Sequence, residues 1–198
     1  MSDRPIIFPR LFERLGNARF ETIGGITGYL DNNATGGASH TWAAAPNGAG
    51  GTIVTLTSGL LEPVVTDGVL ACGLVAEASA TSAAANPPTS LRNPNIHFPW
   101  SLRDMLLLMN ISDASGNVGA ANSAPQLSAV TIGQSYAIIR PTSGPNAGYQ
   151  MLDVSDTTNT LVTVVDKPAS VDGIPNVAAT FNGLVLVRII PSKVQAVA

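Results

Sequence analysis

The last third of the chain alternates short β-forming runs with turn-forming segments, and this pattern constrains the fold more than any other feature. Each run is rich in Val, Ile, Leu, Thr or Tyr, most of which favour strands. The separators contain Gly, Pro, Asn, Asp and Ser, which favour turns. The pattern therefore predicts a meander of strands. The runs occupy residues 129–133, 135–140, 149–154, 160–166, 176–181 and 183–190.

The turn between the last two runs has the strongest local signal. Asn182 and Gly183 separate two β-rich segments. A type I′ turn needs positive φ at both central residues, and an Asn-Gly pair meets that demand at low cost. We therefore predict a two-residue hairpin that joins residues 176–181 to residues 183–190.

A second β-rich region lies in the middle of the chain. Residues 51–58, GTIVTLTS, alternate with the period of a half-buried strand. Residues 60–65 and 69–78 flank a tight-turn signal at Thr66-Asp67-Gly68, so we expect a strand pair there. Pro63 cannot donate a backbone hydrogen bond, which favours an edge position or an irregular entry for the first strand.

Only one stretch, residues 99–110, has helical periodicity. Ser101 is placed to cap a helix, and Asp104 follows at the spacing of a capping box. Apolar residues then recur at i, i+3, i+4 and i+7, which forms one apolar stripe on a helix. We predict a short helix near residues 102–109, within an insertion at about 78–127. The stripe consists of Leu102, Met105, Leu106 and Met109.

Together these patterns predict a mainly β fold: a small β-barrel, β-tulip or sandwich-like domain with one short helical insertion. Residues 23–198 would form this single domain. Residues 1–22 would form an extended N-terminal arm, because they are rich in arginine and because Pro5 and Pro9 favour extended backbone. Residues 10–15, RLFERL, are compatible with one or two turns of helix within the arm.

The charge content favours self-association and disfavours several partner classes. Charged residues make up 12% of the chain, against roughly 25% in an average soluble domain. Because surface charge normally keeps small proteins apart, we expect a homo-oligomer. The net charge is −3 and lysine occurs only at Lys167 and Lys193, so no basic stripe is available for nucleic acid.

No membrane partner is expected either. Four arginines interrupt the first twenty residues, so the start of the chain lacks the apolar core of a secretion signal. No apolar run approaches the roughly 18 residues that span a membrane. We therefore expect a soluble protein that is made in the cytoplasm.

Candidate catalytic and metal-binding residues are few and lack a recognisable spacing. His40 and His97 stand far apart, with no zinc-ligand pattern near either. Cys72 lies in an apolar run with no charged residue that would lower its pKa, so we predict a buried and unreactive thiol. We accordingly expect no enzyme activity, no cofactor and no small-molecule ligand. The aspartates of the last third are predicted to bond to their own turns, and they are Asp153, Asp156, Asp166 and Asp172.

Three segments carry a resemblance to a known family. Residues 51–54 (GTIV), 61–64 (LEPV) and 73–77 (GLVAE) are similar to the β-domains of tailed-bacteriophage head decoration proteins, also called cement proteins. The β-rich runs from residue 133 to 190 also resemble the closing strands of such proteins. The resemblance implies a non-catalytic virion protein on the outer capsid surface. It further implies binding to the major capsid protein, commonly as a homotrimer, so that neighbouring capsid subunits are held together.

Two other function classes remain open. The first is a carbohydrate-binding or host-attachment module of a virion, which would need exposed aromatic platforms such as Trp42 and Trp100. The second is a hydrolase that pairs a serine with His40 or His97, although no nucleophile motif places such a serine.

The N-terminal arm is our predicted contact with the capsid or with a neighbouring subunit. Its arginines alternate with apolar side chains, and an exposed apolar segment needs a partner surface to cover it. An extended arm can also add a strand to the edge of a neighbouring sheet. The alternative is that Phe8, Leu11 and Phe12 pack onto the chain's own core. The predicted contact residues are Arg4, Pro5, Ile6, Ile7, Phe8, Pro9, Arg10, Leu11 and Phe12.

Overall fold

The protein is described by a computed structural model of the whole chain. The structure describes a subset of the residues, among which the barrel and its connections are nearly continuous. These residues are 10–14, 28–30, 53–57, 60–64, 69–71, 73–75, 92–93, 96–97, 105–119, 124–141, 145–146 and 148–194.

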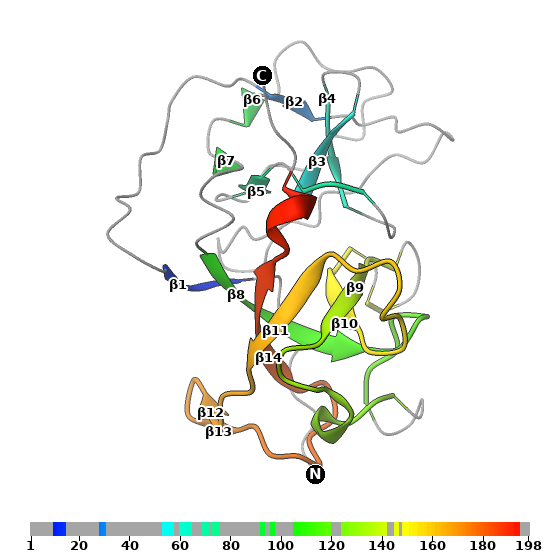
Figure 1. Cartoon of the computed structure of the whole chain (residues 1–198), viewed down its shortest axis with the longest axis vertical. Coiled ribbons are helices and arrows are strands. Elements are labelled where there is room, and N and C mark those ends of the chain that lie inside the picture. Colours follow the sequence, from blue (N-terminus) through cyan, green and yellow to red (C-terminus); the bar gives the residue numbers. More distant parts are fainter. Residues whose placement is uncertain are drawn as a thin grey trace.

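A closed barrel of five strands forms the lower half of the molecule in Figure 1. The strand order is β8-β10-β9-β11-β14, and β14 pairs again with β8, so the sheet closes on itself. All neighbours are antiparallel except β8 and β10, which are parallel. The mainly β prediction is confirmed. The strands are β8 (Met105–Ser112), β9 (Ser135–Ile139), β10 (Met151–Asp153), β11 (Val162–Asp166) and β14 (Leu184–Ile189).

The barrel strands bury apolar residues on both of their faces. Val185 and Val187 in β14 belong to the main core, together with Ile111 of β8. The alternate residues Leu184 and Leu186 belong to a second, smaller cluster on the other face of the same strand. This arrangement follows from strand geometry, because successive side chains point to opposite sides of a sheet.

The predicted helix near residues 102–109 is wrong, because β8 occupies Met105–Ser112. Leu107 and Met109 face the main core, whereas Leu108 faces the smaller cluster. A strand that is covered on both faces needs apolar residues at every position. Such a continuous run also contains apolar residues at i, i+3, i+4 and i+7, so it can be mistaken for a helix. The segment is a central strand of the barrel and not a helical insertion. The proposed cap at Ser101 and Asp104 lies outside the described residues.

Helical structure among the described residues is limited to two single 3₁₀ turns. They are η2 (Leu127–Ala129) and η3 (Pro191–Lys193). The predicted strand at residues 129–133 is wrong, because η2 ends at Ala129 and residues 132–133 form a turn. The predicted strand at residues 176–181 is also wrong, since it contains only a turn and an isolated bridge between Gln126 and Phe181.

The Asn182-Gly183 pair does not form the predicted type I′ hairpin. Asn182 has a φ of 55°, but Gly183 is not among the glycines with positive φ. The chain here contacts β8 instead, with the Asn110 side-chain amide donating to the Asn182 carbonyl and the Ile111 N–H donating to the Gly183 carbonyl. Side-chain and main-chain bonds to a distant strand therefore override the local turn preference.

The type I′ signature is found instead at Asp172-Gly173. These residues have φ values of 52° and 76°, as the two central positions of that turn require. They join β12 (Ser170–Val171) to β13 (Ile174–Pro175) in a short antiparallel hairpin. Val171 from this hairpin covers the outer face of β8 and β14.

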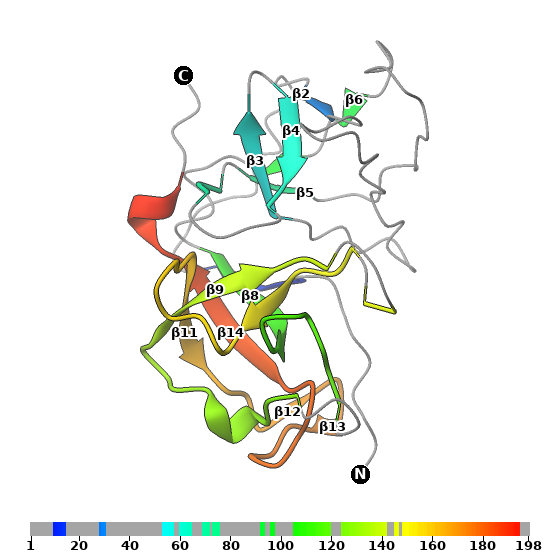
Figure 2. The ribbon, with the colours of Figure 1, turned by 90° about the vertical axis from the view of Figure 1, so that its right-hand side faces the viewer.

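A second sheet lies above the barrel in Figures 1 and 2, with the order β6-β2-β4-β3-β5-β7. The predicted strand in residues 51–58 is confirmed as β3. However, β4 and β5 both pair with β3 and not with each other, which corrects the expected strand pair. The turn at residues 66–68 lies outside the described residues. The strands are β2 (Gly28–Leu30), β3 (Ile53–Thr57), β4 (Leu60–Pro63), β5 (Gly73–Val75), β6 (Arg92–Asn93) and β7 (Ile96–His97).

The expected edge position of the Pro63 strand is also wrong, because β4 lies between β2 and β3. The proline is tolerated there for a local reason. β2 pairs only with Leu60 and Leu61, so no β2 residue is paired with Pro63. The missing N–H therefore interrupts no ladder on that side.

Gln150 joins the barrel to the second sheet. Its side chain is fully buried. The Ile53 N–H donates to Oε1 at 2.6 Å, and Nε2 donates to the Ile53 and Val64 carbonyls, both at 2.8 Å. Ile53, Val64 and Ala71 also belong to the main core of the barrel. The two sheets consequently share one apolar core and one buried polar link.

The loop after β8 is organised by one carboxylate. Asp113 accepts hydrogen bonds from the N–H groups of Ser115 and Asn117, and from the Asn117 side chain. Burial alone raises the pKa of Asp113, but these hydrogen bonds outweigh it and hold the pKa below its ordinary value of 3.8.

We expect Asp113→Asn to lower stability at neutral pH and to have no effect in acid. Because folding depresses this pKa, the ionised carboxylate stabilises the fold above pH 3.8, and this contribution disappears as the pH falls through the folded value. Urea unfolding of the parent and the variant at several pH values measures the difference. A difference that stays constant down to about pH 3 would contradict the assignment.

Candidate interaction surface

Four exposed apolar side chains belong to the barrel and its β12–β13 hairpin, in the turn before β9, in β11, in β13 and just after β13. We call this group, Ile132, Val165, Ile174 and Val177, the barrel-end surface. Their exposed fractions range from 40% for Val165 to 58% for Val177. Only one other large apolar residue among the described residues is exposed, Leu70 at 39%, and it precedes the second-sheet strand β5. The distribution of exposed apolar residues is therefore uneven.

The hairpin that carries Ile174 is fixed by Asn176, which is 3% exposed. The Asn176 side-chain amide donates to the carbonyls of Pro168 and Leu184 at 2.7 and 2.8 Å. Its Oδ1 accepts from the Leu184 N–H at 3.0 Å. The hairpin is thereby anchored to the first residue of β14, and Val177 follows the anchor directly.

The turn that carries Ile132 is fixed against β11 and β9. Gly133 has a φ of 84°, which suits the third position of a type II turn, and its N–H donates to the Val164 carbonyl at 2.8 Å. The Thr131 N–H donates to the Tyr136 hydroxyl at 2.9 Å. These bonds fix a turn whose second residue, Ile132, projects into solvent.

Val165 is exposed because β11 contains a bulge. The register of β11 against β14 shifts between Val164 and Asp166, which leaves Val165 as the extra residue. A bulge re-aims the side chain of the extra residue and bends the strand. Here it leaves an apolar side chain facing solvent close to the last residue of β11.

Main-chain bonds connect the segments of the barrel-end surface. The N–H groups of Leu127 and Ser128 in η2 donate to the carbonyls of Thr180 and Ala178. The Lys167 ammonium reaches the Val130 carbonyl at 2.9 Å. Figures 1 and 2 both show η2 and the β12–β13 hairpin at the end of the barrel that lies away from the second sheet. The exposed apolar residues are thus carried by mutually bonded segments.

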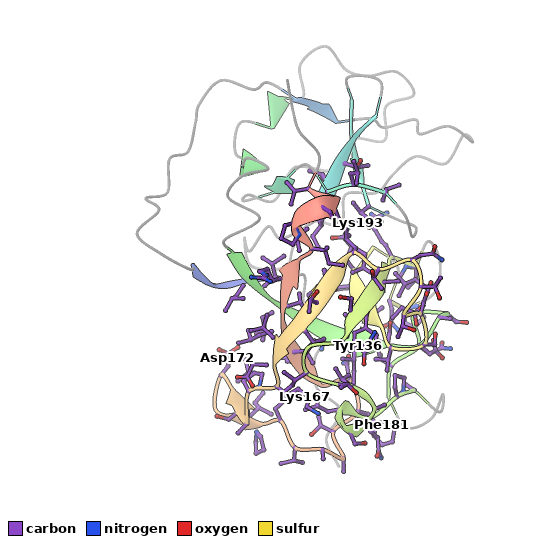
Figure 3. All side chains as sticks on the ribbon, viewed as in Figure 1. Tyr136, Lys167, Asp172, Phe181 and Lys193 are labelled. Atoms are coloured by element: carbon purple, nitrogen blue, oxygen red, sulfur yellow. The ribbon has the colours of Figure 1, made fainter. Side chains whose placement is uncertain are left out.

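Few charges lie among these segments. Residues 127–134 contain none, and residues 165–183 contain only Asp166, Lys167 and Asp172. Figure 3 places Lys167, Asp172 and Phe181 at the same end of the barrel. A surface with this composition is suited to binding an apolar or uncharged partner surface, because little charge has to be desolvated.

The structure places part of the predicted contact arm. Arg10, Leu11 and Phe12 belong to β1 (Arg10–Arg14), which pairs antiparallel with β8 of the same chain. The possible helix in RLFERL is therefore wrong for these residues. The remaining predicted residues lie outside the described residues, and they are Arg4, Pro5, Ile6, Ile7, Phe8 and Pro9.

The turn aspartates behave largely as predicted. Asp153, Asp156 and Asp166 each accept a hydrogen bond from a backbone N–H one to three residues further along the chain. Asp172 lies in the type I′ turn. Such local bonds occupy the carboxylates in shaping their own turns.

The other residues that the sequence analysis considered are only partly placed. His97 lies in β7, where its backbone pairs with Leu74. His40, Trp42, Cys72 and Trp100 lie outside the described residues. Within the part of the chain that the structure describes, no group of three or more His, Cys, Asp or Glu residues is placed to hold a metal ion.

Sequence patterns do not predict the barrel-end surface. Ile174 stands in a turn-rich segment, and an apolar residue in such a segment is a weak signal for an exposed patch. Ile132, Val165 and Val177 lie in runs that are predicted as strands, where an apolar residue is expected to be buried. The type II turn exposes Ile132 and the bulge exposes Val165, and Val177 is exposed in a segment that forms no strand.

The comparisons with known proteins give no match: no protein-family model, no curated protein and no solved structure matches the chain. Among the helices of the described residues, none is long and apolar enough to cross a membrane.

Proposed function

We propose that this chain is a structural virion protein that binds the outer surface of a phage capsid and stabilises the head by linking neighbouring capsid subunits. The barrel-end surface carries the proposal. It offers exposed apolar side chains on segments that are already ordered, so little conformational entropy is lost when a partner binds. Its low charge suits a partner surface that is largely apolar at its centre.

The partner class follows from the family resemblance. The segments GTIV, LEPV and GLVAE supply the neighbouring strands β3, β4 and β5, with β3 in the centre. Residues that are similar to one family and that also lie side by side favour a shared domain over a coincidence of composition. The proposed partner is the major capsid protein, with copies of this chain in a homotrimer on the particle.

Binding to heads that lack the decoration protein tests the proposal. We expect Val177→Asp to lower the affinity for heads assembled from the major capsid protein of the same genome by about tenfold or more, since a charge is buried in the contact. Leu70→Asp is the matched control, because Leu70 is exposed but lies outside the barrel-end surface. The control should bind like the parent.

The possible outcomes distinguish an error in the proposed function from an error in the assigned surface. If the parent protein does not bind the heads, the proposed function is wrong, and binding to a glycan array would then favour a carbohydrate-binding module. If the parent binds but Val177→Asp binds equally well, the surface is misassigned. Thermal unfolding of both variants shows whether each retains the folded barrel.

A further inference from the structure

The barrel closes without β1. The ring β8-β10-β9-β11-β14 is complete, and β1 is an additional strand at its side. Figures 1 and 2 show β1 beside β8 at the boundary between the barrel and the second sheet. Removal of β1 from β8 therefore opens no pairing of the ring itself.

β1 occupies a part of the β8 edge that β10 leaves uncovered. β10 pairs with β8 only at Ile111 and Ser112. β1 pairs with the preceding residues, from Met105 to Leu108, while β14 pairs with the opposite edge. Without a strand in this position, the backbone groups of that edge would be open to pairing with another chain.

The register of β1 on β8 shows which strand fits this edge of β8. Arg10 is opposite Leu108 and Arg14 is opposite Met105, with a bulge between Leu11 and Glu13. The pairing of β1 with its own β8 demonstrates that this sequence fits this edge. Every further copy of the chain carries the same strand.

The connection of β1 to the rest of the fold permits exchange. Arg14 of β1 precedes Met105 of β8 by 91 positions in the sequence. The two strands are therefore connected by a long stretch of chain and not by a short loop. Thirteen residues, 15–27, separate β1 from β2. When extended, that number of residues spans up to roughly 45 Å, which is enough to reach a neighbouring subunit.

We infer that the β8 edge at Met105–Leu108 is an interaction surface for β1 of a second copy of this chain, so that neighbouring copies exchange their N-terminal strands. This goes beyond attachment to a capsid, because it joins copies of the chain to one another. Exchange preserves every bond of the monomer, which is why swapped strands are a low-cost route to oligomers.

The local concentration of β1 decides whether it pairs with β8 of its own chain or with β8 of a second copy. A strand tethered to its own domain has an effective concentration on the order of millimolar. In dilute solution the strand therefore pairs within its own chain. When copies are crowded to a similar concentration, pairing between copies competes, and its share rises with protein concentration.

Disulfide trapping tests the inference in purified protein. One variant carries Arg14→Cys and the other Met105→Cys, both with Cys72→Ser to remove the only native cysteine. The two are refolded together, oxidised and separated under non-reducing conditions. We expect a disulfide-linked heterodimer whose yield rises about tenfold for each tenfold rise in concentration while the monomer predominates.

A mismatched pair provides the control. Arg14→Cys is combined with Ser170→Cys, an exposed position in β12 that is not part of the register of β1. The inference is overturned if the matched pair gives no more heterodimer than this control at the highest concentration, while a single chain with both Arg14→Cys and Met105→Cys forms its internal disulfide. If Met105→Cys does not fold, Arg10→Cys with Leu108→Cys tests the same register. No capsid is used, so the result does not depend on the proposed function.

Discussion

Gln150→Leu is expected to destabilise the protein by about 3 kcal/mol, since it leaves two buried backbone groups without the partners that Gln150 provides. Those groups are the Ile53 N–H and the Val64 carbonyl, and both residues are fully buried. Leucine has nearly the same size, so loss of volume contributes little. The midpoint of urea unfolding measures the change.

Gln134→Leu is the matched control for this prediction. Gln134 is exposed, and its side chain donates only to the adjacent Ser135 carbonyl. We expect its effect to stay within about 0.5 kcal/mol, as for most surface substitutions. Equal effects of the two variants would mean that Gln150 does not hold the second sheet on the barrel.

Gly116→Ala is expected to cost about 3 kcal/mol for two separate reasons. Gly116 has a φ of 71°, which disfavours any residue with a Cβ atom. An added Cβ would also overlap Cγ of Pro141, so the proline ring would have to move. The Asn146 amide donates to the Gly116 carbonyl at 2.9 Å, so the backbone at Gly116 is itself held in place.

Gly133→Ala separates the two reasons. Gly133 has a similar φ of 84°, but nothing lies within 4 Å of an added Cβ. We therefore expect only the conformational cost, about 1 kcal/mol. If both alanine variants unfold at the same urea concentration, the contact with Pro141 is relieved without cost and the second reason is wrong.

Several elements of the fold could be predicted because their signals are local. β3, β9, β10, β11 and β14 all lie within segments whose β-branched and aromatic residues favour extended backbone. The turn aspartates could also be predicted, since an Asp side chain reaches the N–H groups one to three residues ahead whatever the rest of the fold does. The mainly β fold class follows from these local preferences.

The candidate surface and the partner edges could not be predicted in the same way. Ile132 and Val165 are exposed because of a turn against β11 and a bulge in β11, and neither has a distinct local signal. The pairing of β1 with β8 joins residues that are far apart in the sequence. Neither the strand order nor the neighbour of an edge is specified by periodicity, which describes one strand at a time.

The sequence by itself determined which segments prefer to be extended and where the chain prefers to turn. The tertiary structure decided between preferences that compete. Residues 105–112 became a strand because both faces could be covered, by the barrel core and by the cluster around Val171. Gly183 is not the second central residue of a type I′ turn, and its carbonyl accepts a hydrogen bond from the Ile111 N–H of β8. In both cases the free energy of burial and of long-range hydrogen bonds exceeded a local propensity of about 1 kcal/mol or less.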